Sequence, residues 1–259
     1  MKRPLILVTN DDGISSLGIR NLIRIMNDFG NVVVVAPDGP QSAMGHAITI
    51  DSTLRCDEIV IDKGPQKEFA CSGTPVDCVK LAINQLLDIK PDLCVSGINH
   101  GSNSSINVIY SGTMSAAVEG ALNGIPSIGF SLLDYAQDAD FSQAEEYIRK
   151  VTRKVLDQGM EKGVCLNVNI PKSIENKPIK GIKICRQANA KWEEEFEKRM
   201  DPKGRTYYWL TGKFVNYDKR TDSDEWALEN NYVSIVPVQF DITAYSSLST
   251  LSEKFSNDE

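Results

Sequence analysis

Two adjacent carboxylates interrupt an apolar run close to the start of the sequence. Residues 5–8 are continuously apolar, and Asp11, Asp12 and Gly13 follow them. Two neighbouring carboxylates repel each other and lose solvation on burial unless a cation or a shared proton relieves them. Mg²⁺ and Mn²⁺ prefer such oxygen ligands, so the pair could hold a hard divalent cation. Taken alone, Asp-Asp-Gly is more typical of a solvated turn, and the rest of the chain has to decide between the two.

Two further oxygen donors follow later apolar runs. Ser42 lies in the polar loop after residues 32–37, and Asn99 ends the apolar segment of residues 91–99. If these runs are parallel strands, their carboxyl ends lie at one edge of a sheet, where ligands of open α/β sheets bind. We therefore expect the Ser42 hydroxyl and the Asn99 amide oxygen to lie near both aspartates. Ser42 by itself is more typical of an ordinary turn serine.

The sequence also contains a candidate anion site. Ser111, Gly112 and Thr113 precede a run of small residues that predicts a helix, whose first N–H groups could bind an oxyanion. Asn103 can donate amide N–H bonds nearby. A hard cation beside an oxyanion pocket is suited to phosphoryl chemistry, and this combination favours a metal site over a turn. His100 is titratable, but no partner for it is apparent in the sequence.

Apolar runs that alternate with helical patterns must position these residues. Runs without alternation are typical of strands buried on both faces of a sheet, and the first two flank a helical pattern, as in a β-α-β unit. We therefore predict an α/β fold, a Rossmann-like, mostly parallel sheet core with helices on both faces. The expected strands lie near residues 5–8, 32–37, 91–99, 126–132 and 164–171; the expected helices near 18–26, 75–87, 111–121 and 141–157; and a peripheral hairpin or excursion at residues 47–62.

The pattern changes in the last third of the chain. We divide the sequence into an α/β metal- and phosphate-binding core at residues 1–178 and a C-terminal extension at residues 179–259. The extension is expected to carry an oligomerisation arm and a returning strand near residues 232–238. Residues 192–200 are rich in glutamate and predict a solvated helix or an arm, and the aromatic strand that follows favours an interface. The tail after Leu248 is expected to be frayed.

Composition argues against several classes of function. The 259 residues carry a net charge of −7 and no block rich in Lys and Arg, so we expect no nucleic-acid polymer as a partner. No stretch approaches the ~20 apolar residues of a membrane span, no signal-peptide pattern is present, and we expect no membrane partner. The six cysteines form no C-x-x-C pair, so reduced thiols in the cytoplasm are the default expectation. Two histidines are too few for a histidine-rich zinc site.

Several sequence blocks in fixed order resemble the SurE nucleotidases, the stationary-phase survival protein E family. The similarity runs from residue 5 to about residue 245, nearly the whole chain. Any one block would be a weak signal, whereas the ordered set is specific. The blocks are residues 9–13 (TNDDG), 36–38 (APD), 72–78 (SGTPVDC), 96–101 (SGINHG), 110–113 (YSGT), 167–171 (NVNIP), 201–204 (DPKG) and 208–209 (YW).

The resemblance implies a metal-dependent phosphatase that hydrolyses nucleoside 5′- and 3′-monophosphates, and exopolyphosphatase activity is also known in the family. It implies one divalent cation per subunit, Mg²⁺ or Mn²⁺, and a swapped C-terminal arm in homodimers or homotetramers. His100 and Ser105 depart from the small or acidic residues common in the family, which argues against a general family role for His100. The implied metal ligands are Asp11, Asp12, Ser42 and Asn99, and the implied phosphate-binding segment is Ser111, Gly112 and Thr113, with Asn103 adjacent. We further expect Asp11, Asp12 and Asn99 to be catalytic and Asn10 to bind substrate.

The mechanism that we expect is in-line attack by a metal-bound water on the phosphoryl group. Asp11 or Asp12 would hold the cation, and one of them could accept the proton of the water. Two alternatives stay open: a phosphatase with an aspartyl-phosphate intermediate on Asp11, and a nucleotide-binding regulator without catalysis. The sequence does not indicate the preferred base.

Overall fold

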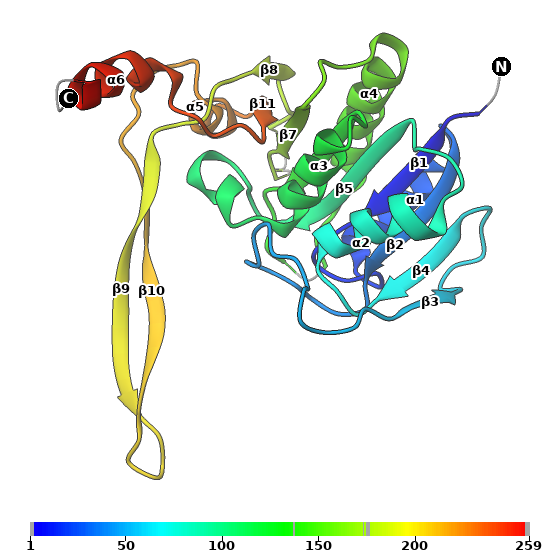
Figure 1. Cartoon of the computed structure of the whole chain (residues 1–259), viewed down its shortest axis with the longest axis horizontal. Helices are drawn as coiled ribbons and strands as arrows, with labels where there is room; N and C mark the ends of the chain where they lie inside the picture. Colours follow the sequence, from blue (N-terminus) through cyan, green and yellow to red (C-terminus); the bar gives the residue numbers. More distant parts are fainter. Residues whose placement is uncertain (1–2, 137, 173, 175–176, 257–259) are drawn as a thin grey trace.

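The computed structural model describes residues 3–136, 138–172, 174 and 177–256 of the chain (Figure 1). One large sheet in these residues has the strand order β3-β4-β2-β1-β5-β6-β7-β11-β8. A separate two-stranded hairpin joins β9 and β10. The strands of the large sheet are β1 (Leu5–Thr9), β2 (Asn31–Pro37), β3 (Cys56–Ile59), β4 (Lys67–Cys71), β5 (Leu93–His100), β6 (Ser127–Leu132), β7 (Val164–Ile170), β8 (Ile182–Ile184) and β11 (Val233–Gln239).

The middle of the sheet is parallel, from β4 through β2, β1, β5 and β6 to β7. Only its margins depart from this, because β3 pairs antiparallel with β4 and β11 pairs antiparallel with β7. The central strands are buried on both faces, since Ile6, Leu7 and Val8 are each fully inaccessible to solvent. The predicted mostly parallel α/β sheet is confirmed, and its carboxyl edge gathers the ends of β1, β2 and β5.

Helices cover both faces of the sheet, as predicted. The helices α1 (Leu17–Met26) and α4 (Ser142–Gln158) bury their apolar residues against one face, which includes Ile6 and Val8. The helices α2 (Pro75–Leu81) and α3 (Gly112–Leu122) pack against the other face, which includes Leu7. Successive side chains of a strand point to opposite faces, so the apolar run of β1 contributes to both layers of the core.

Two local predictions concern the margin of the sheet. The helix expected over residues 75–87 is confirmed as far as Leu86, as α2 followed by a π-helical turn, η1 (Ala82–Leu86). Of the two alternatives for residues 47–62, a hairpin within this range is wrong, because the range contains the single strand β3, which pairs with β4 outside it. β4 also joins the parallel sheet beside β2. The β4 sequence Lys-Glu-Phe-Ala-Cys is short and partly charged, so its pattern did not indicate a buried strand.

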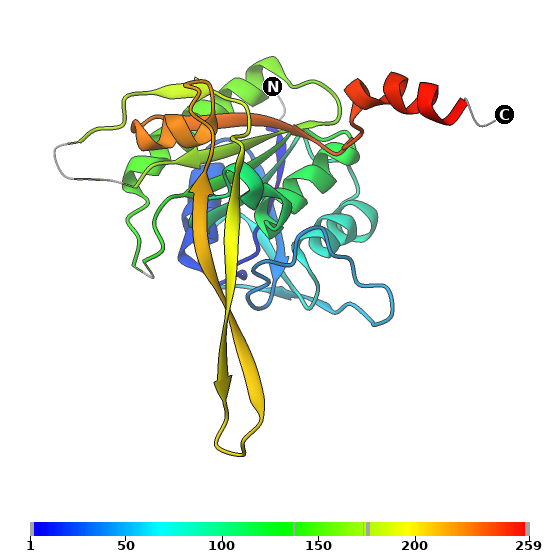
Figure 2. The same ribbon diagram turned by 90° about the vertical axis from the view of Figure 1, so that its left-hand side faces the viewer.

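The C-terminal part of the chain adds β8 and β11 to the large sheet and also forms a separate hairpin. A long hairpin of β9 (Ala190–Met200) and β10 (Thr206–Asn216) projects from the body of the molecule (Figures 1 and 2). Of the two alternatives for residues 192–200, the arm is therefore correct and the solvated helix is wrong. β8 and β11 belong to the large sheet, and the division of the chain at residue 178 stays a prediction. The remaining elements are η2 (Ser105–Ile109), α5 (Asp224–Glu229), η3 (Tyr245–Ser247) and α6 (Leu248–Ser256).

The tail after Leu248 is helical, so the expectation of a frayed tail is wrong for the described residues. Its side chains are exposed, including Leu248, Leu251 and Phe255. Among the residues that the structure describes, no helix has both the length and the apolar character that a membrane crossing requires.

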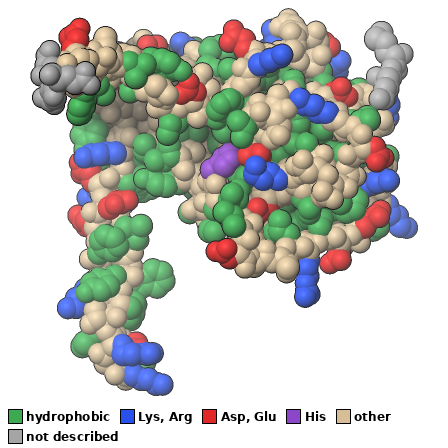
Figure 3. Space-filling model, in the orientation of Figure 1, with side chains coloured by type: hydrophobic (Ala, Val, Ile, Leu, Met, Phe, Trp, Pro, Cys, Tyr) green, Lys and Arg blue, Asp and Glu red, His purple; other side chains and the backbone are tan. Residues whose placement is uncertain are grey.

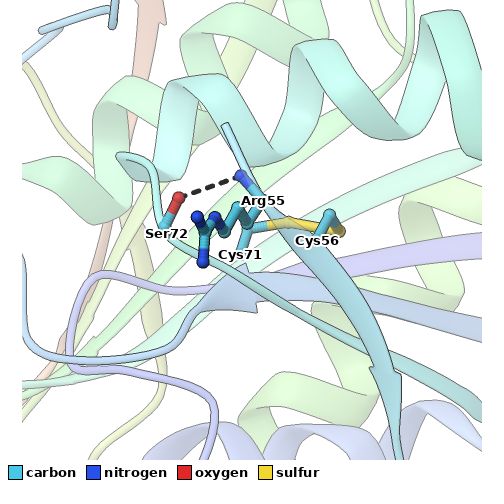
Figure 4. Close-up of a disulfide and its surroundings, with 4 residues drawn as sticks. All are labelled: Arg55, Cys56, Cys71 and Ser72. Carbon is cyan, nitrogen blue, oxygen red and sulfur yellow. Dashed lines mark hydrogen bonds between the residues drawn. A yellow bond between two sulfur atoms is a disulfide. The ribbon is translucent and has the colours of Figure 1, made fainter. Parts of the chain in front are cut away.

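Cys56 and Cys71 form a disulfide between β3 and β4, where they face each other in the antiparallel register (Figure 4). Next to it, the backbone N–H of Arg55 donates to the hydroxyl of Ser72 at 3.0 Å. The expectation that the cysteines are reduced is thus wrong for this pair. Cys94 and Cys165 are free and buried, as expected of small core residues.

Candidate functional site

β1 delivers the two predicted carboxylates to the carboxyl edge of the sheet. Asp11 is only 4% exposed, whereas Asp12 is half-buried. Gly13 turns the chain back with a φ of +93°, and a Cβ at this position would lie 3.2 Å from the carbonyl carbon of Gly39. Glycine therefore permits the tight turn that follows the aspartates. The end of β1 is packed against the loop after β2.

Helix α3 begins directly against Asp11. The hydroxyl of Thr113, which is fully buried, donates to Asp11 Oδ1 at 2.5 Å. A Cβ at Gly112 would lie 2.7 Å from the Cβ of Asp11. Since real Cβ contacts are not that short, only glycine fits here without a shift of the aspartate. The start of the predicted anion site, Gly112 and Thr113, is therefore in direct contact with Asp11 of the predicted metal site.

Burial dominates the electrostatics of Asp11. Burial raises its pKa, the hydrogen bond from Thr113 lowers it, and the neighbouring charge of Asp12 raises it again, which brings the pKa to about 6. A buried carboxyl that is left without a neutralising group binds a proton more readily than an exposed one. A divalent cation would supply the missing positive charge.

Asn99 lies at the end of β5, where the pairing with β6 shifts register between Ser96 and Asn99. Its side-chain Nδ2 donates to the carbonyl oxygens of His100 and Gly101, at 3.3 and 3.0 Å. The amide is thereby oriented, and its Oδ1 is the atom that can act as an acceptor or a metal ligand.

The loop that carries Ser42 is fastened beside Asp11. The backbone N–H of Gln41 donates to the carbonyl oxygen of Asp11 at 2.7 Å. Ser42 itself is exposed. The structure thus brings the loop to the aspartates, and the ligand role of the Ser42 hydroxyl stays a prediction.

Two side chains of the predicted phosphate-binding segment form hydrogen bonds within the protein. The Ser111 side chain accepts from the N–H of Met114 at 3.0 Å and caps α3. The first N–H groups of a helix lack intrahelical acceptors, so the start of α3 can still bind an anion through its backbone. The Thr113 O–H, in contrast, already donates to Asp11, whereas the Ser111 hydroxyl only accepts and its O–H can still donate to an anion.

Asn10 and Asn103 are also held by the protein itself. Asn10 Nδ2 donates to the carbonyl oxygen of Gly13 and to Ser16 Oγ, both at 2.9 Å. Asn103 Nδ2 donates to Ser131 Oγ at 2.9 Å, and the Asn103 backbone N–H donates to Asn169 Oδ1 at 2.8 Å. Both side chains brace the loops around the aspartates. Their role in substrate binding stays a prediction.

His100 has a partner that the sequence did not indicate. Its Nδ1 lies 3.4 Å from Asp12 Oδ2, and its ring stands edge-on to Phe141 with centroids 5.2 Å apart. The sequence separation of Asp12 and His100 conceals this contact, which arises because β1 and β5 are adjacent strands. The only advance signal is that both residues follow the ends of predicted parallel strands.

The donor set suits a hard cation. Among the described residues, no three His, Cys, Asp or Glu side chains converge on one point. The candidate site combines two carboxylates with hydroxyl and amide oxygens, which Mg²⁺ and Mn²⁺ accept and softer metals do not favour. The buried and uncompensated Asp11 carboxyl is consistent with that assignment.

Comparisons with known proteins identify the family and the fold. The family model described as "Survival protein SurE" matches residues 6–194. The chain is 64% identical over 252 residues to the 5′-nucleotidase SurE of Flavobacterium psychrophilum, covering 97% of this chain and 98% of that protein. It is 46% identical over 251 residues to the protein of the same name from Phocaeicola vulgatus, with 96% of each chain covered. The crystal structure of the SurE protein from Aquifex aeolicus superposes with a TM-score of 0.82 at 37% identity, covering 96% of this chain and 99% of that one.

Proposed function

The chain belongs to the SurE family, and from this premise we propose that it is a 5′-nucleotidase that hydrolyses nucleoside monophosphates to nucleoside and phosphate. The observation that carries the proposal is the contact between the buried Asp11 carboxyl and the first turn of α3. It joins a cation site to an anion site, and phosphoryl transfer needs both.

The four oxygen donors Asp11, Asp12, Ser42 and Asn99 would hold one divalent cation per subunit, Mg²⁺ or Mn²⁺. When bound, such a cation polarises phosphoryl oxygens and makes water more acidic. Asp11 supplies a carboxylate that is already oriented by Thr113. Asn99 supplies an amide oxygen whose direction is fixed by the two bonds of its Nδ2.

The residues around the donors orient the substrate and move the proton. The backbone N–H groups at the start of α3 bind the phosphate oxygens and stabilise the charge of the transition state. Asp12 is the more accessible carboxylate and accepts the proton of the attacking water. His100 Nδ1 lies 3.4 Å from Asp12 Oδ2 and holds that carboxylate in place. Asn103, braced by Ser131, keeps the adjacent loop in position for the substrate.

Several finer features belong to the proposal. We extend the substrate class to nucleoside 3′-monophosphates and short polyphosphate, and we place the protein in the cytoplasm as a homodimer or homotetramer. The net charge of −7 supports a small anionic substrate, neutralised locally, rather than a nucleic-acid polymer. The exposed aromatic residues of the hairpin support self-association.

The test is phosphate release from a panel of nucleoside 5′- and 3′-monophosphates and short polyphosphate, with EDTA, Mg²⁺ and Mn²⁺ in parallel. We expect release from monophosphates that depends on a divalent cation and stops in EDTA. Nucleotide binding without release under any metal would instead support a non-catalytic regulator. A trapped, acid-stable phosphoryl group on Asp11 would support the aspartyl-phosphate mechanism.

A further inference from the structure

A buried acid on α3 lies outside the residues assigned to the active site. Glu119 is 1% exposed. Its Oε1 accepts from Lys80 Nζ at 2.8 Å and from Asn123 Nδ2 at 2.9 Å. Its Oε2 lies 3.1 Å from His46 Nε2. Three segments therefore meet on one carboxylate: α2 through Lys80, α3 through Asn123, and the loop after β2 through His46.

Glu119 is ionised at neutral pH. Burial raises its pKa, but the hydrogen bonds from His46 and Lys80, together with the Lys80 charge, outweigh burial and bring the pKa to about 2. An ionised carboxylate can only accept hydrogen bonds, so His46 Nε2 is the donor in this contact. Hydrogen bonds to charged and buried groups are stronger than those between neutral groups.

His46 belongs to the loop that carries Ser42. The start of the loop is fixed by the Gln41 N–H, which donates to the Asp11 carbonyl oxygen at 2.7 Å. Its end is fixed where Thr74 Oγ1 donates to the Ala47 carbonyl oxygen at 2.8 Å. Between these points, the Gly45 N–H donates to the Tyr110 carbonyl oxygen at 3.1 Å, and the side chain of His46 reaches the buried Glu119.

Helix α3 connects this contact to the active site. Its first turn abuts Asp11 through Gly112 and Thr113. Glu119 lies about two helical turns further along the same helix. α2 packs beside α3 on the same face of the sheet (Figure 1). One rigid element thus fixes the orientation of Asp11 and also anchors the loop of Ser42.

We propose that His46 is a positioning residue, which acts through Glu119 to hold the Ser42 loop against α3 and so completes the cation site. The proposal rests on the proposed function, because Ser42 is assigned there as a metal ligand. His46 itself touches neither the cation nor the substrate. Its contribution is to reduce the freedom of the exposed residues 42–44 before the cation binds.

Lys80 provides a matched control. It contacts the other oxygen of the same carboxylate, at a similar distance, but it comes from α2 and not from the loop. Lys80→Met therefore removes one charged partner of Glu119 and leaves the loop attached. His46→Ala removes the side-chain anchor of the loop and leaves its backbone hydrogen bonds in place. His46→Gln keeps an amide donor near the position of Nε2 and should restore the contact.

Two readouts test the proposal on the full-length protein. The first is Mn²⁺ affinity without substrate, measured from the electron paramagnetic resonance signal of free Mn²⁺. The second is hydrogen exchange of the backbone amides of residues 42–46 in EDTA. We expect His46→Ala to bind Mn²⁺ about tenfold more weakly, the effect of one lost hydrogen bond to a charged group. Its loop amides should also exchange faster. His46→Gln and Lys80→Met should stay close to wild type in both readouts.

Unchanged exchange of the loop amides in His46→Ala would overturn the inference, as would equal losses of Mn²⁺ affinity in His46→Ala and Lys80→Met. The second result would mean that the Glu119 cluster acts only through general stability. If the wild-type protein failed to bind Mn²⁺, the proposed metal dependence would be wrong. The exchange experiment would then still decide whether His46 anchors the loop.

Discussion

Asp11 is the residue on which the site depends most. It is buried, it follows β1 directly, and it receives the hydroxyl of Thr113. Burial without a neutralising partner opposes ionisation, so the metal-free protein holds this carboxyl in an unfavourable state at neutral pH. The buried Asp11 carboxyl therefore costs stability in the metal-free protein, and its role as a metal ligand stays a proposal.

This leads to a pH prediction for the metal-free protein. The folded-state pKa of Asp11 is raised from 3.8 to about 6, so the folded state binds the proton more tightly than the unfolded chain. Its contribution to stability is present below about pH 4 and is lost as the pH rises through 6. The full shift corresponds to about 2–3 kcal/mol. We expect Asp11→Asn to lack this loss.

Chemical denaturation in EDTA at pH 5 and pH 7.5 measures the effect. The wild-type free energy of unfolding should fall between these values relative to that of Asp11→Asn, and the variant should be the more stable protein at pH 7.5. The same pH dependence in both proteins would show that Asp11 ionises normally. Added Mn²⁺ should reverse the order by stabilising the wild type.

At the scale of elements, α3 connects the parts of the site. Gly112→Ala tests this role, because the new Cβ would lie 2.7 Å from the Asp11 Cβ and must displace the aspartate or the helix. We expect kcat/KM to fall by about a hundredfold, since small displacements of catalytic groups have effects of that size. The melting temperature should fall by only a few degrees, because overpacking a buried position costs about 1–3 kcal/mol.

Gly39→Ala is the control for this variant. Gly39 lies in the neighbouring loop, and a Cβ there would meet no atom within 4 Å. Steady-state kinetics and thermal melting of both variants separate an effect on Asp11 from a general effect of added bulk. Wild-type kcat/KM in Gly112→Ala would show that the close approach of α3 is not required.

Much of the sheet could be predicted from the sequence, for a physical reason. β1, β2 and β6 are buried on both faces, so their apolar runs identify them without any knowledge of the partners. β4 escaped prediction because its charged first residues hide a strand that is only partly buried. β9 could not be distinguished from a helix, because its strand structure depends on pairing with β10.

The sequence could indicate which strand ends carry the candidate residues, but it could not indicate their side-chain contacts. β1 and β5 are adjacent parallel strands, so Asp11 and Asp12 follow the strand next to the one that carries Asn99, and their joint role as ligands stays a prediction. The bond from Thr113 to Asp11 and the approach of His100 to Asp12 depend on side-chain directions across distant segments. The role of Glu119 was likewise hidden, because its partner His46 lies in a loop without regular pattern.

At the scale of the whole molecule, the projecting hairpin of β9 and β10 exposes large hydrophobic side chains. Its side chains include exposed Phe196, Tyr208, Trp209 and Leu210, each more than half accessible. Figure 3 shows hydrophobic side chains along the arm and Lys and Arg side chains at its tip. An exposed apolar surface of this kind is typical of a protein–protein interface.

The arm leads to a prediction about assembly. Glu193 faces Lys213 in the register, so the hairpin can be shortened by joining these residues with an Asn-Gly turn. This keeps the root of the arm, where Trp192 Nε1 donates to Asn107 Oδ1 at 2.8 Å. We expect the wild type to be a dimer or tetramer by light scattering and the shortened variant to have a lower mass. A monomeric wild type would contradict the interface.

The most direct test of the central claim is phosphate release from a nucleoside 5′-monophosphate by the wild type and by Asp12→Asn, each with Mn²⁺ and with EDTA. The account predicts release by the wild type only with Mn²⁺. It predicts a loss of about a hundredfold or more in turnover for Asp12→Asn, with an unchanged melting temperature. Wild-type turnover in folded Asp12→Asn, or full activity in EDTA, would contradict the assignment of the paired carboxylates.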